Sequence, residues 1–156
     1  MDLLAQFEAI VDALTRARVE FAVCGGLAVN VHGHVRATMD VDLLLPSAQV
    51  DAALSALKPL GYEFDGGVLP FDTGTERERE IRRVTRIEGD DALTVDLLYA
   101  PSAFDEVWRT RVSLPWRGRS LPVVSLEGLA VMKRIAGRLQ DLADLERLGV
   151  EVDRER

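Results

Sequence analysis

Residues 21–45, FAVCGGLAVNVHGHVRATMDVDLLL, constrain the fold of this chain more than any other stretch. They predict a short apolar strand, a glycine pair, a brief helix, a polar loop and a second apolar strand. The second strand carries Asp40 and Asp42. Because side chains alternate between the faces of a strand, both carboxylates point the same way. Two like charges on an apolar strand are costly unless they are solvated or neutralised, and hard divalent cations are common neutralisers. We therefore expect Asp40 and Asp42 to bind Mg²⁺ or Mn²⁺; two solvated acids at a strand end are the alternative.

Gly25 and Gly26 lie between the first strand and the helix that follows it. Glycine lets the backbone come close to a ligand, and the amides at the start of a helix are free to bind an anion. This pair predicts a phosphate-binding turn, although a plain turn would use the same residues. A phosphate site next to metal-binding carboxylates is typical of metal-assisted phosphoryl or nucleotidyl transfer.

Two motifs in this stretch, G-G-x-A and R-x-T-x-D-x-D-L, resemble those of the nucleotidyltransferase fold shared with DNA polymerase beta. The nearest resemblance is to its small AbiEii-like and minimal toxin-type members. A later segment at 133–145, KRIAGRLQDLADL, resembles the K…R…D-x-x-D-L segment of the same group. The matching residues of the first two motifs are Gly25, Gly26, Ala28, Arg36, Thr38, Asp40, Asp42 and Leu43.

The resemblance implies a third catalytic carboxylate on a later strand. Asp96, within the apolar run LTVDLLY, is the candidate, and it would act as base and shared metal ligand. A hydrogen-bonded core carboxylate is the alternative, since a lone acid among apolar residues needs a partner. Asp90 and Asp91 are rival candidates, but their place beside Gly89 is typical of a turn.

Four more residues are candidates for nucleotide binding. Arg36 would hold a triphosphate or pair with Asp40 or Asp42, and Thr38 would bond a phosphate oxygen or orient a carboxylate. The resemblance implies that Lys133 contacts the nucleotide phosphates, with Asp141 positioning Lys133 or another basic residue. A solvated, salt-bridged surface is the alternative for these last two.

Charge and composition favour some acceptor classes over others and indicate a cellular location. The chain has 156 residues and a formal net charge of −7, which makes RNA a less favoured acceptor than a protein or small molecule. Arginine clusters at 77–86 and 109–119 would carry any RNA binding. The sequence shows no membrane-length apolar run and no basic leader, and it has one cysteine, Cys24, so we expect a cytoplasmic location.

The expected fold is α/β (α+β), a small mixed sheet flanked by helices. Residues 1–100 would form the catalytic core, and 101–156 a hairpin plus helices packed on it. Residues 81–87 and 93–99 predict an antiparallel pair of strands, and 62–71 a strand or a hairpin around Gly66 and Gly67. Gly137 is expected to separate the last two helices.

The sequence thus predicts transfer of a nucleoside monophosphate from an NTP to an acceptor hydroxyl on RNA, protein or a small molecule. The resemblance adds a toxin–antitoxin role and an antitoxin partner. One alternative is a nucleotide- or partner-binding module of the same fold without turnover. Another is an enzyme that moves the γ-phosphate instead.

Overall fold

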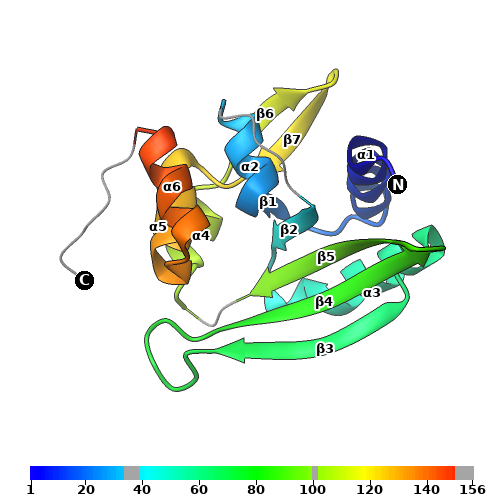
Figure 1. Ribbon diagram of the computed structural model, residues 1–156, viewed down its shortest axis with the longest axis horizontal. Helices are drawn as coiled ribbons and strands as arrows, with labels where there is room; N and C mark the ends of the chain where they lie inside the picture. The colour runs from blue at the N-terminus through cyan, green and yellow to red at the C-terminus, as the bar shows by residue number, and fades with distance from the viewer. Residues whose placement is uncertain (34–38, 100–101, 150–156) are drawn as a thin grey trace.

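A computed structural model describes residues 1–33, 39–99 and 102–149 (Figure 1). Within them the strands form one seven-stranded mixed sheet in the order β3-β4-β5-β2-β1-β7-β6. The expected α/β class, a mixed sheet flanked by helices, is confirmed. The strands are β1 (Ala22–Cys24), β2 (Asp40–Leu44), β3 (Phe64–Phe71), β4 (Arg79–Glu88), β5 (Asp91–Tyr99), β6 (Val112–Trp116) and β7 (Arg119–Val123).

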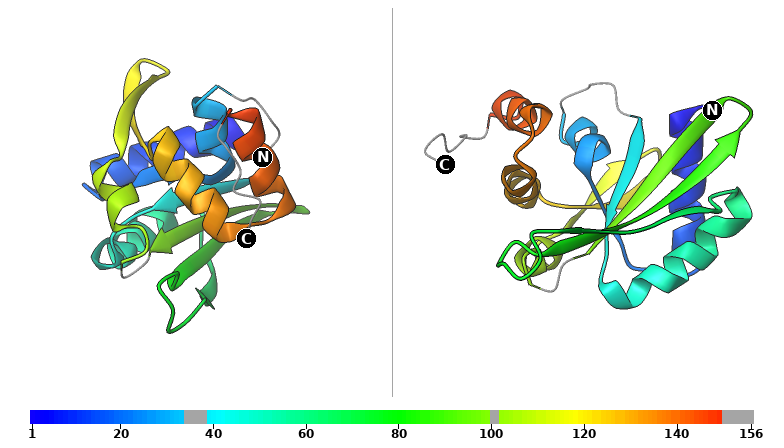
Figure 2. Two further views of the ribbon diagram at one scale, coloured as in Figure 1. Left: turned by 90° about the vertical axis from the view of Figure 1, so that its left-hand side faces the viewer. Right: turned by 60° about the horizontal axis from the view of Figure 1, so that its bottom comes forward.

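The helices fall into two groups. α1 packs against α3, whereas α2, α4 and α6 each contact α5. Figures 1 and 2 show α5 and α6 side by side, well apart from α1 and α3. Their bounds are α1 (Leu3–Arg16), α2 (Gly25–Val31), α3 (Val50–Leu57), α4 (Asp105–Arg109), α5 (Leu126–Ala136) and α6 (Leu139–Arg147), with short 3₁₀ turns at η1 (Ser47–Gln49) and η2 (Lys58–Leu60).

The centre of the sheet combines both strand orientations. β1 pairs antiparallel with β2, and β2 pairs parallel with β5. On the other side β1 pairs parallel with β7, so the hairpin β6–β7 belongs to the same sheet. Segments far apart in the sequence therefore meet at β1 and β2, which places the residues of 21–45 in the middle of the fold.

Side chains of β2 alternate between the hydrophobic core and the face that carries Asp40 and Asp42. Val41 and Leu43 are fully buried, and they belong to the same core cluster as Phe7 and Leu14 of α1 and Leu57 of α3. Asp40 is exposed and Asp42 only partly buried. Helix α1 forms because its apolar stripe faces this core and because Asp2 caps it, accepting a hydrogen bond from the Leu4 amide at 3.0 Å.

Two local expectations are settled by the structure. Of the two alternatives for residues 62–71, the strand is confirmed and the hairpin is not: Gly66 and Gly67 lie in the single strand β3, at an irregularity in its pairing with β4 between Asp65 and Val68. The Asp65 carboxylate accepts a hydrogen bond from the Gly67 amide at 2.7 Å, which stabilises this bulge. The helix after β1 begins at Gly25 itself rather than after the glycine pair. Within the described ranges, no helix combines the length and apolar character needed to cross a membrane.

Candidate active site

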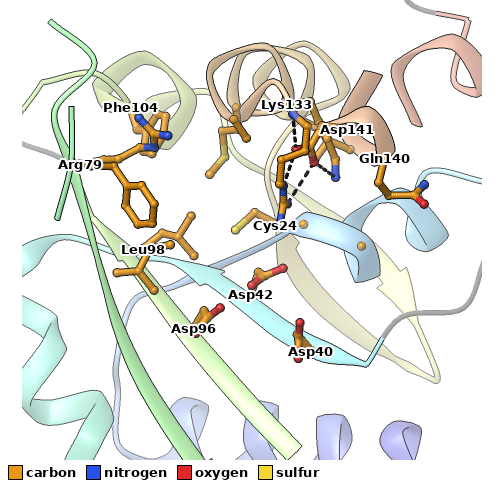
Figure 3. Close-up of a pocket in the computed structure, with 18 of the residues that line it drawn as sticks. Cys24, Asp40, Asp42, Arg79, Asp96, Leu98, Phe104, Lys133, Gln140 and Asp141 are labelled. Atoms are coloured by element: carbon orange, nitrogen blue, oxygen red, sulfur yellow. Dashed lines mark hydrogen bonds and ion pairs between the residues drawn. The ribbon is translucent and has the colours of Figure 1, made fainter. Parts of the chain in front are cut away.

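Asp42 of β2 stands in a row of polar side chains that crosses four strands, and Asp40, two residues earlier, lies on the same face of the sheet. The strand registers pair Cys24 with Asp42, Asp42 with Asp96, and Asp96 with Arg83. Directly opposed residues on neighbouring strands point to the same face of the sheet. The row therefore runs thiol, carboxylate, carboxylate, guanidinium on one face. Figure 3 shows Asp40, Asp42 and Asp96 on this face, below the helices that carry Lys133 and Asp141.

Gly25 brings the backbone into contact with this row. Its φ is +63°, in the left-handed region, and a Cβ placed on it would lie 2.0 Å from Asp42 Oδ2. Any other residue would collide with the carboxylate and adopt a strained backbone conformation. Gly25 thus has to be glycine so that the start of α2 can lie directly against Asp42.

The surroundings of Asp42 disfavour the ionised form of its carboxyl group. Burial, followed by the negative charges of Asp96 and Asp40, raises its pKa from 3.8 to about 7, although Lys133 and Arg138 act in the opposite direction. The same surroundings affect Cys24, which is a free, buried cysteine: burial and then Asp42 raise the pKa of its thiol. Cys24 is therefore an uncharged, tightly packed end of the row.

Asp96 is held by a forked ion pair. Arg83 donates from Nε to Asp96 Oδ1 at 2.8 Å and from Nη2 to Oδ2 at 3.1 Å. The hydrogen bonds to Asp96 raise the pKa of the guanidinium. The Asp96 side chain is only 8% exposed, whereas that of Arg83 is 45% exposed. Asp96 is fixed in orientation by a partner that faces solvent and has room to move.

A second charged cluster joins the last two helices. Lys133 is buried in α5, and its Nζ lies 3.1 Å from Asp141 Oδ1 and 3.0 Å from Asp144 Oδ2 on α6. The exposed Arg138 side chain adds a second cation, donating from Nε to Asp141 Oδ2 at 2.7 Å. Burial alone would raise the pKa of Asp141, but its hydrogen bonds with Arg138 and the charge of Lys133 lower it below the ordinary value.

The residues that begin and end α5 explain how the cluster forms. Ser125 caps α5 by accepting a hydrogen bond from the Gly128 amide at 3.0 Å. α5 ends at Gly137, whose φ of +65° is the left-handed conformation typical of a helix C-terminus, as expected from the sequence. The chain then reverses into α6, and the reversal returns Asp141 and Asp144 to Lys133.

The row and the cluster face one another across a cavity of about 650 Å³ (Figure 3). Its lining includes seven of the residues predicted for the site: Gly25, Gly26, Asp40, Asp42, Asp96, Lys133 and Asp141. Arg36 and Thr38 lie outside the described residues. Of the rival candidates, Asp90 lies in the turn between β4 and β5, and Asp91, the first residue of β5, pairs with the chain's amino terminus. The fold thus gathers residues from four separate stretches at one place.

Sequence reasoning missed the role of Arg83, which it treated only as part of a basic cluster. The sequence held a signal for this pair. Glu88 pairs with Asp91 across a two-residue turn, and five residues farther from the turn on each strand Arg83 pairs with Asp96. Arg79, Ile81, Leu98 and Phe104 also line the cavity and were not predicted for the site.

The donor set fits a hard divalent cation at Asp40 and Asp42. Both offer carboxylate oxygens, and the raised pKa of Asp42 reflects burial and then the neighbouring negative charge, which a cation would offset. Over the residues that the structure describes, no group of three acidic, histidine or cysteine side chains is already gathered as a metal site. The Arg83 pair explains part of this, because it occupies both oxygens of Asp96.

Comparison with known proteins agrees with this fold. A family model for aminoglycoside-2''-adenylyltransferases matches residues 6–148. No curated protein gives a significant match to the sequence. Among solved structures, TM1012 of Thermotoga maritima, a protein assigned to the nucleotidyltransferases, superposes with a TM-score of 0.62 at 17% identity, covering 92% of this chain and 90% of that one.

Two structures of the antibiotic-resistance factor ANT(2'')-Ia are also similar. The crystal structure, in complex with adenylyl-2''-tobramycin, gives a TM-score of 0.57 at 16% identity over 92% of this chain and 85% of that one. The solution structure gives 0.58 at 18% identity over 92% and 80%. At these identities the structures show a shared fold.

Fold and family together define a nucleotidyltransferase, and the expected superfamily is confirmed. The chain belongs to the aminoglycoside-2''-adenylyltransferase family, whose model spans nearly its whole length. The nearer resemblance to toxin-type members stays a prediction.

Proposed function

We propose that this nucleotidyltransferase moves a nucleoside monophosphate from an NTP to a hydroxyl of a small-molecule acceptor, with Mg²⁺ or Mn²⁺ held by Asp40 and Asp42. The observation that carries the proposal is the close approach of Gly25 to Asp42 at the end of the Cys24–Asp42–Asp96–Arg83 row. This approach places the Gly25 backbone, which can come close to a phosphate, beside carboxylates whose negative charge a cation would neutralise. A bound divalent ion would polarise the phosphate oxygens and offset the charge of the leaving pyrophosphate.

The other roles follow from position. The backbone of Gly25 and Gly26 would lie against the β- and γ-phosphates. Asp96 would accept the proton of the acceptor hydroxyl as its oxygen bonds to the α-phosphorus and the bond to pyrophosphate breaks. Arg83 orients Asp96 through the forked pair and would have to release one carboxylate oxygen for that proton transfer.

Lys133 and Arg138 bring positive charge to the wall opposite the aspartates. Lys133 as a phosphate contact stays part of the proposal, and it would act while two carboxylates already surround it. Asp96 would join the metal site only after Arg83 releases one of its oxygens. Arg36 and Thr38 also stay predicted nucleotide contacts.

The choice of a small-molecule acceptor rests on charge and on family. A net charge of −7 disfavours a polyanionic RNA. The matching family is named for transfer to aminoglycosides, which are small molecules. The toxin–antitoxin role and an antitoxin partner have no such support and stay predictions from the resemblance.

The test follows the fate of labelled ATP. Purified protein is incubated with Mg²⁺, an acceptor panel and ATP labelled at either the α- or the γ-phosphate. Transfer of the α-label with release of pyrophosphate supports the proposal, and transfer of the γ-label would make the protein a phosphotransferase instead. Absence of transfer with every acceptor, despite tight ATP binding, would favour the binding-module alternative.

Two variants assign the roles within that assay. Asp96→Asn should bind ATP about as well as wild type and lose at least about 10³-fold in turnover, because a base acts mainly in the transition state. Asp42→Asn should weaken Mg²⁺-dependent ATP binding as well. Asp90→Asn, on the exposed β4–β5 turn, is the matched control and should change neither. Equal ATP affinity with Mg²⁺ and with EDTA would contradict the metal site.

A further inference from the structure

The cavity continues beyond Asp96 along one wall of the sheet. Side-chain alternation puts Arg79, Ile81 and Arg83 on the same face of β4, and the register places Ile81 opposite Leu98 and Arg79 opposite Phe71. All of these residues line the cavity. We call this surface the β4 wall: Phe71, Arg79, Ile81, Arg83 and Leu98.

The β4 wall itself contains no carboxylate, and the acid beside it, Asp96, is already paired with a guanidinium. Arg83 occupies both oxygens of Asp96. Arg79 pairs with Asp72 at 2.7 Å and lies over the Phe71 ring at 5.1 Å, with its side chain only 13% exposed. The exposed surface of the wall is therefore aliphatic and aromatic apart from Arg83, whose side chain is 45% exposed, and its charged groups are two arginines with their partners.

The whole described lining is balanced in charge. Its acids are Asp40, Asp42, Asp96 and Asp141, and its bases are Arg79, Arg83, Lys133 and Arg138. Asp96 and Asp141 pair with Arg83, Lys133 and Arg138. Asp40 and Asp42 are the pair proposed to hold the metal. A ligand with several ammonium groups would meet arginines on the β4 wall and lose hydration without gaining carboxylate partners.

From this we infer that the acceptor is an uncharged or anionic hydroxyl compound with an aliphatic or aromatic body that lies on the β4 wall. The inference rests on the proposed function, because Asp96 is taken as the group that receives the hydroxyl proton. The wall is adjacent to Asp96 on the side away from Gly25 and Asp42, where the nucleotide would lie. This chain would then differ in acceptor charge from ANT(2'')-Ia, whose crystal structure contains an adenylylated tobramycin.

Calorimetric binding of two probes tests the inference. The uncharged aromatic glycoside 4-nitrophenyl β-D-glucopyranoside and the polyammonium sugar tobramycin are titrated into protein saturated with Mg²⁺ and α,β-methylene-ATP, which cannot transfer its nucleotide. We expect the glycoside to bind at least about ten-fold more tightly than tobramycin. Tighter binding of tobramycin, or no measurable binding of the glycoside, would overturn the inference.

A matched pair of variants places the binding on the wall. Ile81→Glu puts a carboxylate in the centre of the wall, so glycoside affinity should fall about ten-fold and tobramycin affinity should rise several-fold. Ile87→Glu is the same change on the same strand and face, at a position that is 51% exposed and outside the cavity lining. It should alter neither affinity. Equal effects of the two variants would remove the wall from the site.

Binding and turnover separate this inference from the proposed function. If the glycoside is preferred but no α-label is transferred from ATP to any acceptor, the proposed function fails and the cavity's ligand preference stands. If tobramycin is adenylylated with high affinity, the proposed function stands and the inference about acceptor charge is wrong.

Discussion

Two groups of carboxylates face each other across the cavity, and their charges are offset in different ways. On the helical side, Asp141 and Asp144 share Lys133, and Arg138 adds a second cation, so the pKa of Asp141 is lowered. On the sheet side, Asp42 lies beside Asp40 and Asp96, and its pKa rises to about 7. The difference separates acids whose ion pairs stabilise the fold from acids whose mutual repulsion and burial are unfavourable.

Lys133 should matter most for stability. Lys133→Met leaves Asp141 and Asp144 buried without their shared cation, so we expect a loss of about 3–5 kcal/mol in the free energy of unfolding. Urea denaturation measures it. Asp42→Asn should instead leave stability unchanged or raise it, because it removes one of several like charges. If both variants lose the same stability, the two carboxylate groups do not differ as the comparison requires.

The two groups should also give opposite pH dependence. The folded pKa of Asp42 is raised from 3.8 to about 7, so its contribution to stability is complete below about 4 and is lost as the pH rises through about 7. The largest loss would be roughly 4 kcal/mol, reduced by the partial exposure of the side chain. Asp141, with a lowered pKa, contributes stability that is lost as the pH falls through its folded pKa.

Unfolding free energies of wild type and Asp42→Asn between pH 4.5 and 8 isolate this effect, since the contributions of other groups cancel in the difference. The variant should gain on wild type as the pH rises. Saturating Mg²⁺ with ATP should diminish the gain if the ion binds the ionised form. A difference that stays flat with pH would show that Asp42 is not burdened by its neighbours.

A substitution at Gly25 tests the contact between the backbone and Asp42 on the sheet side of the cavity. Gly25→Ala combines a strained φ of +63° with a Cβ 2.0 Å from Asp42 Oδ2, and we expect a loss of about 2 kcal/mol or more together with weakened ATP binding. Gly118→Ala is the matched control, because its φ is +76° and nothing lies within 4 Å of the added Cβ. Both variants carry backbone strain, so the difference between them measures the contact with Asp42.

The smallest effect is expected at Arg138. Its side chain is 77% exposed, although it pairs with the buried Asp141. Arg138→Ala should cost about 1 kcal/mol or less, because Lys133 still neutralises Asp141 and solvent screens the lost pair. Thermal denaturation at low and high salt checks this. A loss as large as that of Lys133→Met would mean that Arg138 matters to Asp141 as much as Lys133 does.

Much of the site could be predicted because its signals are local. The Asp-x-Asp spacing fixes the shared face of Asp40 and Asp42, and the break at Gly137 separates the last two helices where expected. For residues 62–71 the sequence left a strand or a hairpin open, because two glycines suit a bulge as well as a turn, and pairing with β4 decided for the strand.

The sequence by itself determined the elements near Gly25, the alternating faces of β2 and the nucleotidyltransferase superfamily of the chain. Only the tertiary structure decided that β5 lies parallel to β2, so that Asp96 meets Asp42, and that α6 folds back to surround Lys133. The physical reason is range. Periodicity, turn residues and caps act over a few residues, whereas the pairing of distant strands and helices depends on burying the whole core at once.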